Sequence, residues 1–242
     1  MRIRLISWNI HKGIGGIDRR YRLERIIEIL RGYAPDVALL QEVAQFMPRS
    51  HFHDQAEILR EVLGMPYWAH APQHKFRIGG YGNAILSRWP LADVSEIDLT
   101  LPGRKKRGAL QARMKVQKGR RTRTVVLYDL HLGLTGRERA SQLERFLASR
   151  PFQGHKARTP IVVAGDLNDV WGTLCARFLQ PAGFERAGAM WNTFPAWLPI
   201  RPLDGIFVRG KVRSHGTQIC RKPLARVASD HRPLIAELEL FA

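Results

Sequence analysis

The segment Ile161-Val162-Val163-Ala164-Gly165-Asp166-Leu167-Asn168 joins four apolar residues to a glycine, an aspartate and an asparagine. The apolar run predicts a buried strand of an α/β fold. Asp166 and Asn168 follow where this strand ends, and residues two apart in an extended chain face the same way. The segment therefore places a carboxylate and an amide side by side at the end of a buried strand.

A second motif of similar chemistry lies near the far end of the chain. Ser229-Asp230-His231 stands just before the apolar run Leu234-Ile235-Ala236. Hydrolysis of a phosphodiester needs a cation to stabilise the developing charge, a carboxylate to orient water, and polar groups on the phosphate oxygens. The two motifs contain a candidate for each of these roles.

Three more apolar runs end in polar side chains that can bind a metal or a phosphate. The runs at residues 3–8, 37–40 and 125–130 end at Asn9, at Gln41 and Glu42, and at His131. Taken singly, such residues are more often turn formers, caps, solvated strand ends or half-buried histidines. Their occurrence at five strand edges favours a common site over five separate explanations.

Seven short motifs, taken in order, resemble those of the endonuclease/exonuclease/phosphatase superfamily. They are Ser7-Trp8-Asn9, Leu40-Gln41-Glu42, Gly82-Asn83-Ala84-Ile85-Leu86-Ser87-Arg88, His131-Leu132-Gly133, Gly165-Asp166-Leu167-Asn168, Leu203-Asp204-Gly205-Ile206-Phe207 and Ser229-Asp230-His231-Arg232-Pro233. One motif alone would be weak evidence, whereas seven in the right order are specific. The resemblance implies a four-layer α/β/β/α sandwich, with two packed mixed sheets flanked by helices, and a single catalytic domain over residues 1–242.

The resemblance also implies a metal site for Mg²⁺, which Mn²⁺ can replace. Glu42 would be the main metal carboxylate, with Asn9 and Asp230 completing or bordering the site. Carboxylate and amide oxygens are the ligands that such hard cations prefer. Among the remaining histidines, His11, with Lys12 beside it, is the one expected nearest to this site because it follows Asn9 closely.

The catalytic roles come from the same resemblance. Asp166 would orient the attacking water, and Asn168 would hold the scissile phosphate. Asp204 would pair with His231, keep one tautomer of its ring and favour the cation, which would contact the phosphate. His131 stands where abasic-site endonucleases of the superfamily carry tyrosine and the secreted nucleases, sphingomyelinases and inositol phosphatases carry histidine. It is expected to protonate or stabilise the leaving oxygen.

The charge of the chain predicts a large anionic partner. It has 39 Lys and Arg against 21 Asp and Glu, a formal charge of +18, which favours nucleic acid. The cluster Arg104-Lys105-Lys106-Arg107 is expected near the site as a substrate-binding group, together with Asn83 and Trp191. A second basic cluster, residues 120–123, should lie in a hairpin turn about 27 Å away along a strand of about eight residues, where a merely solubilising role is equally open. Trp191 begins an aromatic, proline-rich loop that would suit stacking on a base, contact with a bilayer, or packing over a sheet edge.

Periodicity predicts three amphipathic helices among the strands. Leu23, Ile26, Ile27 and Leu30 have helical spacing, residues 137–148 form a second helix, and Trp171, Leu174, Cys175 and Phe178 repeat the first pattern. Further strands are expected at residues 83–87, 110–116, 205–208 and 234–240. The alternation in residues 110–116 predicts a strand with one solvated face.

These observations predict a metal-dependent phosphodiesterase that acts on nucleic acid. An anionic phospholipid or a small phosphoester is the alternative substrate. A non-catalytic nucleic-acid or membrane-surface binder is the alternative of another class, but a scaffold would not need the complete set of site residues. The absence of a leader, of about 18 consecutive apolar residues and of any CxxC pairing of Cys175 and Cys220 predicts a cytoplasmic protein without a transmembrane segment. A monomer is expected.

Overall fold

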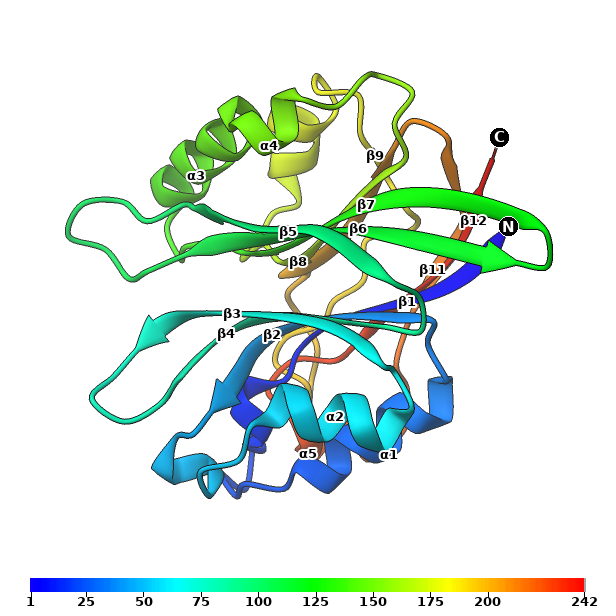
Figure 1. Ribbon diagram of the computed structural model, residues 1–242. Coiled ribbons are helices and arrows are strands. Elements are labelled where there is room, and N and C mark those ends of the chain that lie inside the picture. The colour runs from blue at the N-terminus through cyan, green and yellow to red at the C-terminus, as the bar shows by residue number, and fades with distance from the viewer. Residues whose placement is uncertain (242) are drawn as a thin grey trace.

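The apolar runs pair into two six-stranded sheets that pack face to face, with helices on both outer faces (Figure 1). The computed structural model describes residues 1–241. The first sheet has the order β11 (Val212–Ile219), β12 (Leu234–Leu240), β1 (Arg2–Asn9), β2 (Val37–Gln45), β4 (Gly80–Ser87), β3 (Tyr67–Lys75). The second has the order β5 (Leu91–Asp98), β6 (Gly108–Lys118), β7 (Arg121–His131), β8 (Ile161–Asp166), β10 (Asp204–Arg209), β9 (Glu185–Arg186). The predicted α/β sandwich is confirmed.

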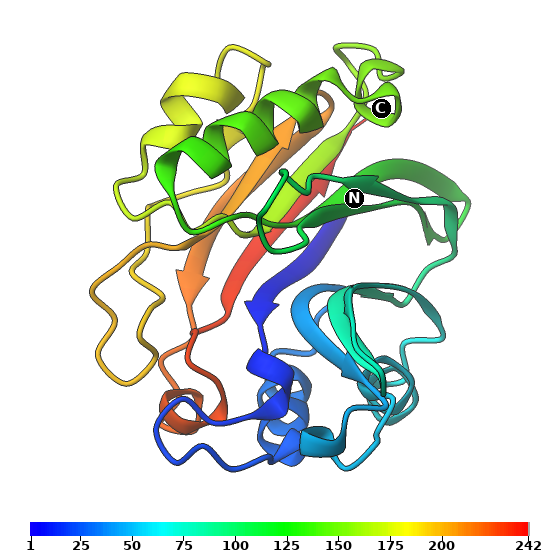
Figure 2. The ribbon, with the colours of Figure 1, turned by 90° about the vertical axis from the view of Figure 1, so that its left-hand side faces the viewer.

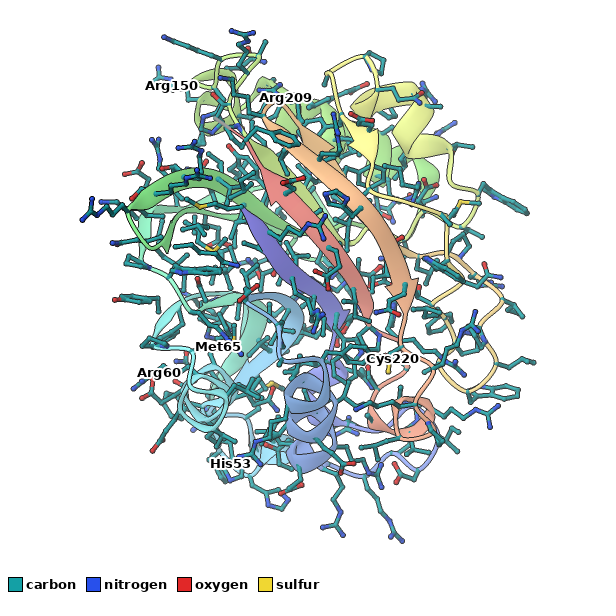
Figure 3. The ribbon with its side chains drawn as sticks, turned by 90° about the vertical axis from the view of Figure 1, so that its right-hand side faces the viewer. His53, Arg60, Met65, Arg150, Arg209 and Cys220 are labelled. Carbon is teal, nitrogen blue, oxygen red and sulfur yellow. The ribbon has the colours of Figure 1, made fainter. Side chains whose placement is uncertain are left out.

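Helices complete the outer layers. The first sheet is covered by α1 (Leu23–Tyr33), α2 (Gln55–Leu63) and the short α5 (Ala225–Ala228), and the second by α3 (Gly136–Ala148) and α4 (Arg150–Gln153) (Figure 1). Short 3-10 turns, η1 (His11–Gly13) and η2 (Pro48–Ser50), follow β1 and β2. The buried thiol of Cys220 packs with α1 residues in the outer core of the first sheet (Figure 3). No helix of the described residues is long and apolar enough to cross a membrane.

Alternate residues of a strand face the same side of the sheet, so polar residues at the strand ends can lie on the same side as the apolar core. Between the sheets lies a cluster of aliphatic side chains from both, including Leu5, Leu127 and Ala164. Five polar residues near the strand ends lie an even number of positions from a member of this cluster on the same strand, so their side chains are on the same side of the sheet. The pairs of core and site residue are Leu5 and Asn9, Leu39 and Gln41, Leu127 and His131, Ala164 and Asp166, and Ile206 and Asp204.

Strand register brings these positions to one end of the sandwich, here called the site end. Asn9 pairs with Gln41 across β1 and β2, while Asp166 pairs with both His131 and Asp204 on its two neighbours. The hairpins that join β3 to β4 and β5 to β6 project at this end, to the left of Figure 1. Figure 2 faces it, with loops surrounding the strand ends.

A bulge in β2 turns Glu42 away from its expected direction. Glu42 would otherwise follow Ala38 and Leu40 toward the helices, but the pairing of β2 with β4 shifts between Leu40 and Val43. Glu42 itself has a positive φ of 54°. A bulge of this kind re-aims one side chain without ending the strand, and here it sends the carboxylate toward the site.

The predicted helices at residues 23–30 and 137–148 are confirmed as α1 and α3, but the third is only partly right. Trp171 is 79% exposed, and Gly172 has a φ of 67°. The left-handed glycine separates Trp171 from the following turn, which the Asp169 carboxylate caps through the amides of Thr173 and Leu174. The helical part is the short π-helix η3 (Cys175–Leu179). The predicted inward position of the Cys175 side chain lies outside the described part of the chain.

The strand expectations hold with two exceptions. Residues 110–116 lie in β6, but Gln111 on its supposedly solvated face is only 6% exposed and contacts the Asp93 carbonyl on the edge strand. The strands β3, β5, β9 and β11 were not predicted, because none contains a continuous apolar run: β9 has only two residues, and polar residues interrupt the other three. The second basic cluster, residues 120–123, does lie at the β6–β7 hairpin, opposite the site end.

Candidate active site

One oxygen of Asp166 is the point on which the site converges. The Asn9 amide donates to Asp166 Oδ2 at 3.0 Å, which links the two sheets, and the Asn168 backbone N–H donates to Asp166 Oδ1 at 3.0 Å. Nε2 of His131 and Nε2 of His231 lie 3.5 and 3.7 Å from the same Oδ2 atom. Asp166 is 2% exposed, and its burial raises its pKa to about 6, against the lowering effect of His231.

Asp204 and His231 form the pair that the family resemblance implies. His231 Nδ1 lies 2.8 Å from Asp204 Oδ2, and the Thr193 hydroxyl donates to the same oxygen at 2.5 Å. The ring of Phe194 lies 5.1 Å from the His231 ring and covers one side of it. Burial alone would lower the pKa of His231, but the Asp204 and Asp166 carboxylates outweigh it and raise the pKa to about 10. This ring is therefore a cation at neutral pH.

His131 is held in the opposite state. It is 7% exposed, and burial together with the positive charge of Arg107 lowers its pKa well below the usual value. The neutral ring of His131 and the cationic ring of His231 therefore both lie close to the Asp166 carboxylate, whose pKa is near 6. Opposed protonation states of neighbouring groups are typical of sites that move protons.

Of the expected metal ligands, Asn9 ends β1, Glu42 lies in the last part of β2, and Asp230 precedes β12. The Glu42 carboxylate pairs with the Lys12 ammonium. Burial would raise the pKa of Glu42, but Lys12 outweighs it and lowers the pKa to about 2. Asn9 Oδ1 accepts from the His11 backbone N–H at 3.0 Å, and Asp230 Oδ1 lies 3.8 Å from the His11 ring.

This donor set fits a hard divalent cation. It consists of two carboxylates and an amide oxygen, and the Lys12 ammonium shows that the position beside Glu42 already accommodates positive charge. A second group, Asp166, Asp204 and His231, also brings three potential ligand atoms within 4.8 Å of one another. In that group Asp204 Oδ2 is shared by two donors, whereas the buried Asp204 Oδ1 has no hydrogen-bond partner.

The four basic residues expected to bind the substrate, residues 104–107, differ in burial. Arg107 is 8% exposed and shares a pocket with Gln73, His74, Asn83 and His131. Three buried nitrogens of the pocket residues, Arg107 Nε, Gln73 Nε2 and His74 Nε2, have no hydrogen-bond partner. Unpaired buried donors are costly unless a ligand or water satisfies them.

Arg104, Lys105 and Lys106, in contrast, are exposed. They line two hollows of about 280 and 230 Å³ on either side of Arg107. Arg104 Nε lies 3.6 Å from the Glu138 carboxylate. The predicted four-residue cluster is therefore one buried group next to His131 and three groups at the rim.

Trp191, predicted to bind substrate, packs at the sheet edge instead. Its indole N–H donates to the Thr217 carbonyl on β11 at 3.1 Å, and its ring packs against the core between the sheets. No contact described for residues 1–241 joins it to the groups around Asp166. The edge of the sheet offers the indole both apolar contact and an acceptor, and this combination holds it away from the site. Asn83 does line the pocket, but its amide donates to the Asp129 carbonyl at 2.7 Å.

Sequence reasoning missed Thr193, Phe194, Gln73 and His74. The first two lie beside Trp191 in the aromatic loop, and the other two lie on the unpredicted strand β3. None belongs to a motif of the resemblance. Position was a signal for Thr193 and Phe194 alone, since the aromatic loop directly precedes Asp204.

The sandwich and the acidic, amide and imidazole groups at its site end define a phosphoesterase-type α/β fold. The chain belongs to the endonuclease/exonuclease/phosphatase family, whose model matches residues 6–231. It is 31% identical to the uncharacterized protein YbhP of Escherichia coli K12, over 98% of this chain and 96% of that one.

Two solved structures show the same fold. An endonuclease/exonuclease/phosphatase from Beutenbergia cavernae matches with a TM-score of 0.82 and 22% identity, over 99% of this chain and 72% of that one. The mannosyl-6-phosphatase Bt3783 of Bacteroides thetaiotaomicron matches with a TM-score of 0.75 and 16% identity, over 98% and 100% of the chains. Members of this family are typically hydrolases that act on phosphoesters.

Proposed function

We propose that the chain is a Mg²⁺-dependent phosphodiesterase. The observation that carries the proposal is the convergence of Asn9, His131 and His231 on one oxygen of Asp166. A carboxylate with a pKa near 6 can take a proton from water at neutral pH, which an ordinary aspartate does poorly. Glu42, Asn9 and Asp230 would hold the cation, which when bound would supply positive charge to the phosphate oxygens.

The chain's own residues have distinct tasks in this reaction. Asp166 accepts a proton from water as the new O–P bond forms and the ester P–O bond breaks. The cationic ring of His231, held by Asp204, stabilises the negative charge that develops on the phosphate. Asn168 would hold the phosphate through the second N–H of its side-chain amide, because the first donates to the Leu132 carbonyl at 2.9 Å. The neutral ring of His131 donates a hydrogen bond to the leaving oxygen, which departs as an alkoxide and takes its proton from solvent water.

The substrate is a phosphodiester carried by a larger anion. Arg107 and the unpaired nitrogens of Gln73 and His74 extend the site beyond the scissile phosphate. The charge of +18 supports nucleic acid as the substrate class. An anionic phospholipid has the same phosphodiester chemistry, and the surface of the site end supports it more directly.

The test is a substrate panel with purified protein and Mg²⁺ or Mn²⁺. The substrates are bis(p-nitrophenyl) phosphate, plasmid, single-stranded DNA, RNA, abasic duplex, anionic phospholipid vesicles and inositol phosphates. Glu42→Gln should abolish turnover of every substrate that the protein hydrolyses, whereas Glu61→Gln, an exposed carboxylate on α2, should not. Activity that survives Glu42→Gln and chelation would overturn the metal-dependent mechanism.

A further inference from the structure

Large apolar side chains are concentrated at the site end. Fourteen of them are exposed among the described residues, and three, Tyr67, Trp68 and Val94, lie on strands away from the site end. The other eleven lie on loops around it: Ile17, Phe46, Phe52, Phe76, Ile78, Leu134, Trp171, Met190, Trp197, Leu198 and Ile200. Scattered apolar residues need no explanation, but a concentration of them around a site marks an interaction surface.

Two phenylalanines in the loop after β2 are exposed to solvent, and backbone hydrogen bonds fix the conformation of the chain at both. Phe46 and Phe52 have φ angles of 55° and 59°, a region that favours glycine and asparagine. Their backbone N–H groups donate to the carbonyls of His53 and Met47 at 3.0 Å. The rings are 52% and 57% exposed. The backbone conformation does not favour phenylalanine at these positions, and more than half of each ring is left uncovered by the chain.

The hairpin between β3 and β4 extends the same surface. Its residues Phe76 and Ile78 are 57% and 52% exposed. A Cβ placed on Gly79 would lie 2.5 Å from the carbonyl oxygen of Phe46, so the hairpin and the loop after β2 are in direct contact. Phe46, Phe52, Phe76 and Ile78 therefore form one rim, which we call the first rim.

A second rim lies beside His231. Trp197, Leu198 and Ile200 are exposed on the aromatic loop, and Ile17 is exposed on the loop after η1. Residues from these two loops, together with Arg226 and Asp230, line a common pocket of about 140 Å³. The first rim follows Glu42 on β2 and the second covers Asp230, so the two rims flank the site.

The loops that carry the rims are basic. Residues 46–53, 75–80 and 187–203 contain four Lys or Arg and no Asp or Glu. In the loop at residues 10–22 the one acidic residue, Asp18, is paired with Arg25 at 2.7 Å. Arg49, Lys75 and Arg77, which lie beside the residues of the first rim in the chain, are all exposed. The surface therefore combines apolar tips with uncompensated positive charge.

We propose that the site end docks on the surface of an anionic phospholipid bilayer. Aromatic and aliphatic side chains enter the boundary between head groups and acyl chains, and Lys and Arg attract the anionic head groups. Nucleic acid offers aromatic faces for stacking, which suits Phe and Trp but leaves Ile17, Ile78 and Ile200 without a partner. Six of the eleven exposed side chains are aliphatic or methionine, and a bilayer accepts both kinds. Docking would bring head-group phosphodiesters to the site, so this inference names a substrate class for the proposed function.

The experiment measures cosedimentation of the full chain with vesicles in EDTA, so that binding is separated from hydrolysis. Vesicles of phosphatidylcholine alone are compared with vesicles that also contain phosphatidylglycerol. The test variants are Phe76→Ser with Ile78→Ser, and Trp197→Ser with Leu198→Ser. The matched control is Tyr67→Ser with Trp68→Ser, which removes exposed aromatic area at the opposite end of β3. Thermal denaturation of each variant checks the fold.

We expect binding to the anionic vesicles, with each test variant weakening it by about ten-fold or more and the control leaving it nearly unchanged. Equal effects of control and test variants, or absence of binding, would overturn the proposal. Duplex or single-stranded DNA that competes fully with vesicles and loses affinity with the same variants would favour nucleic acid instead. Vesicle binding without turnover of any phosphodiester would leave docking intact and remove the proposed reaction.

A second measurement does not depend on variants that disturb the fold. Trp197 is 52% exposed, so its emission should shift to shorter wavelength on binding and be quenched by brominated acyl chains. Comparison of the protein with Trp197→Phe isolates this contribution from the other tryptophans. No difference between the two proteins would show that the second rim does not enter the bilayer and would contradict docking by this face.

Discussion

The Nδ1 atom of His231 lies 2.8 Å from Oδ2 of Asp204, although 27 residues separate them in the chain. The same oxygen accepts the Thr193 hydroxyl, so the carboxylate is fixed from two sides. His231 Nε2 then faces Asp166, the other carboxylate of the group. Two carboxylates around one buried ring favour its cation.

Replacement of Asp204 should lower the pKa of His231. The pKa is raised from 6.5 to about 10, so the stabilisation from the charged ring is full below pH 6.5 and is lost as pH rises through 10. Asp204→Asn should cost stability most at acid and neutral pH, and its loss of activity should deepen as pH rises and the ring becomes neutral. NMR titration of His231 in both proteins measures the shift, and identical pKa values would show that Asp204 is merely positional. Asp98→Asn, on the edge strand β5, is the control.

Removing the charge of Glu42 should weaken the metal site without loss of the fold. Glu42→Gln keeps the shape of the side chain but leaves a hard cation without its main carboxylate. We expect weak Mg²⁺ binding in isothermal titration calorimetry and loss of turnover. A mutant with wild-type turnover at low Mg²⁺ would exclude Glu42 as a principal ligand.

Loss of the Asp166 carboxylate should affect the chemical step. Asp166→Asn should reduce the single-turnover rate on the order of 10² to 10⁴ if Asp166 accepts the proton of water. In the wild-type protein the rate should fall as the pH drops through about 6, where Asp166 takes up a proton. An unchanged single-turnover rate would reassign Asp166 to a structural role at the end of β8.

Of the four basic residues before β6, the buried Arg107 should have a different function from the three exposed ones. Replacing the exposed Arg104, Lys105 and Lys106 by Ala should flatten the salt dependence of binding to duplex DNA, with the log–log slope falling by about 0.9 for each phosphate that these side chains neutralise. Turnover of bis(p-nitrophenyl) phosphate should stay almost unchanged. Arg107→Ala should instead impair the small substrate as well, because Arg107 lies beside His131. Equal behaviour of both variants would contradict this division.

Much of the fold and the site was determined by the sequence alone. The continuous apolar runs predicted the positions of the buried strands, and they also put Asn9, Asp166 and His131 where these strands end. The family motifs added the sandwich topology and the pairing of Asp204 with His231. Such features are local in the chain, or repeat in order along it, so a pattern of residues is enough to predict them.

Other features were decided only by the tertiary structure. The bulge that aims Glu42 depends on the pairing of β2 with β4, and the burial of Arg107 depends on the neighbouring β3, a polar edge strand that no periodicity predicted. Trp191 and Phe194 lie three residues apart in one loop, yet one packs at the sheet edge and the other covers His231. Burial and direction of a side chain depend on which distant strands surround it, and that information is not contained in any local stretch of the sequence.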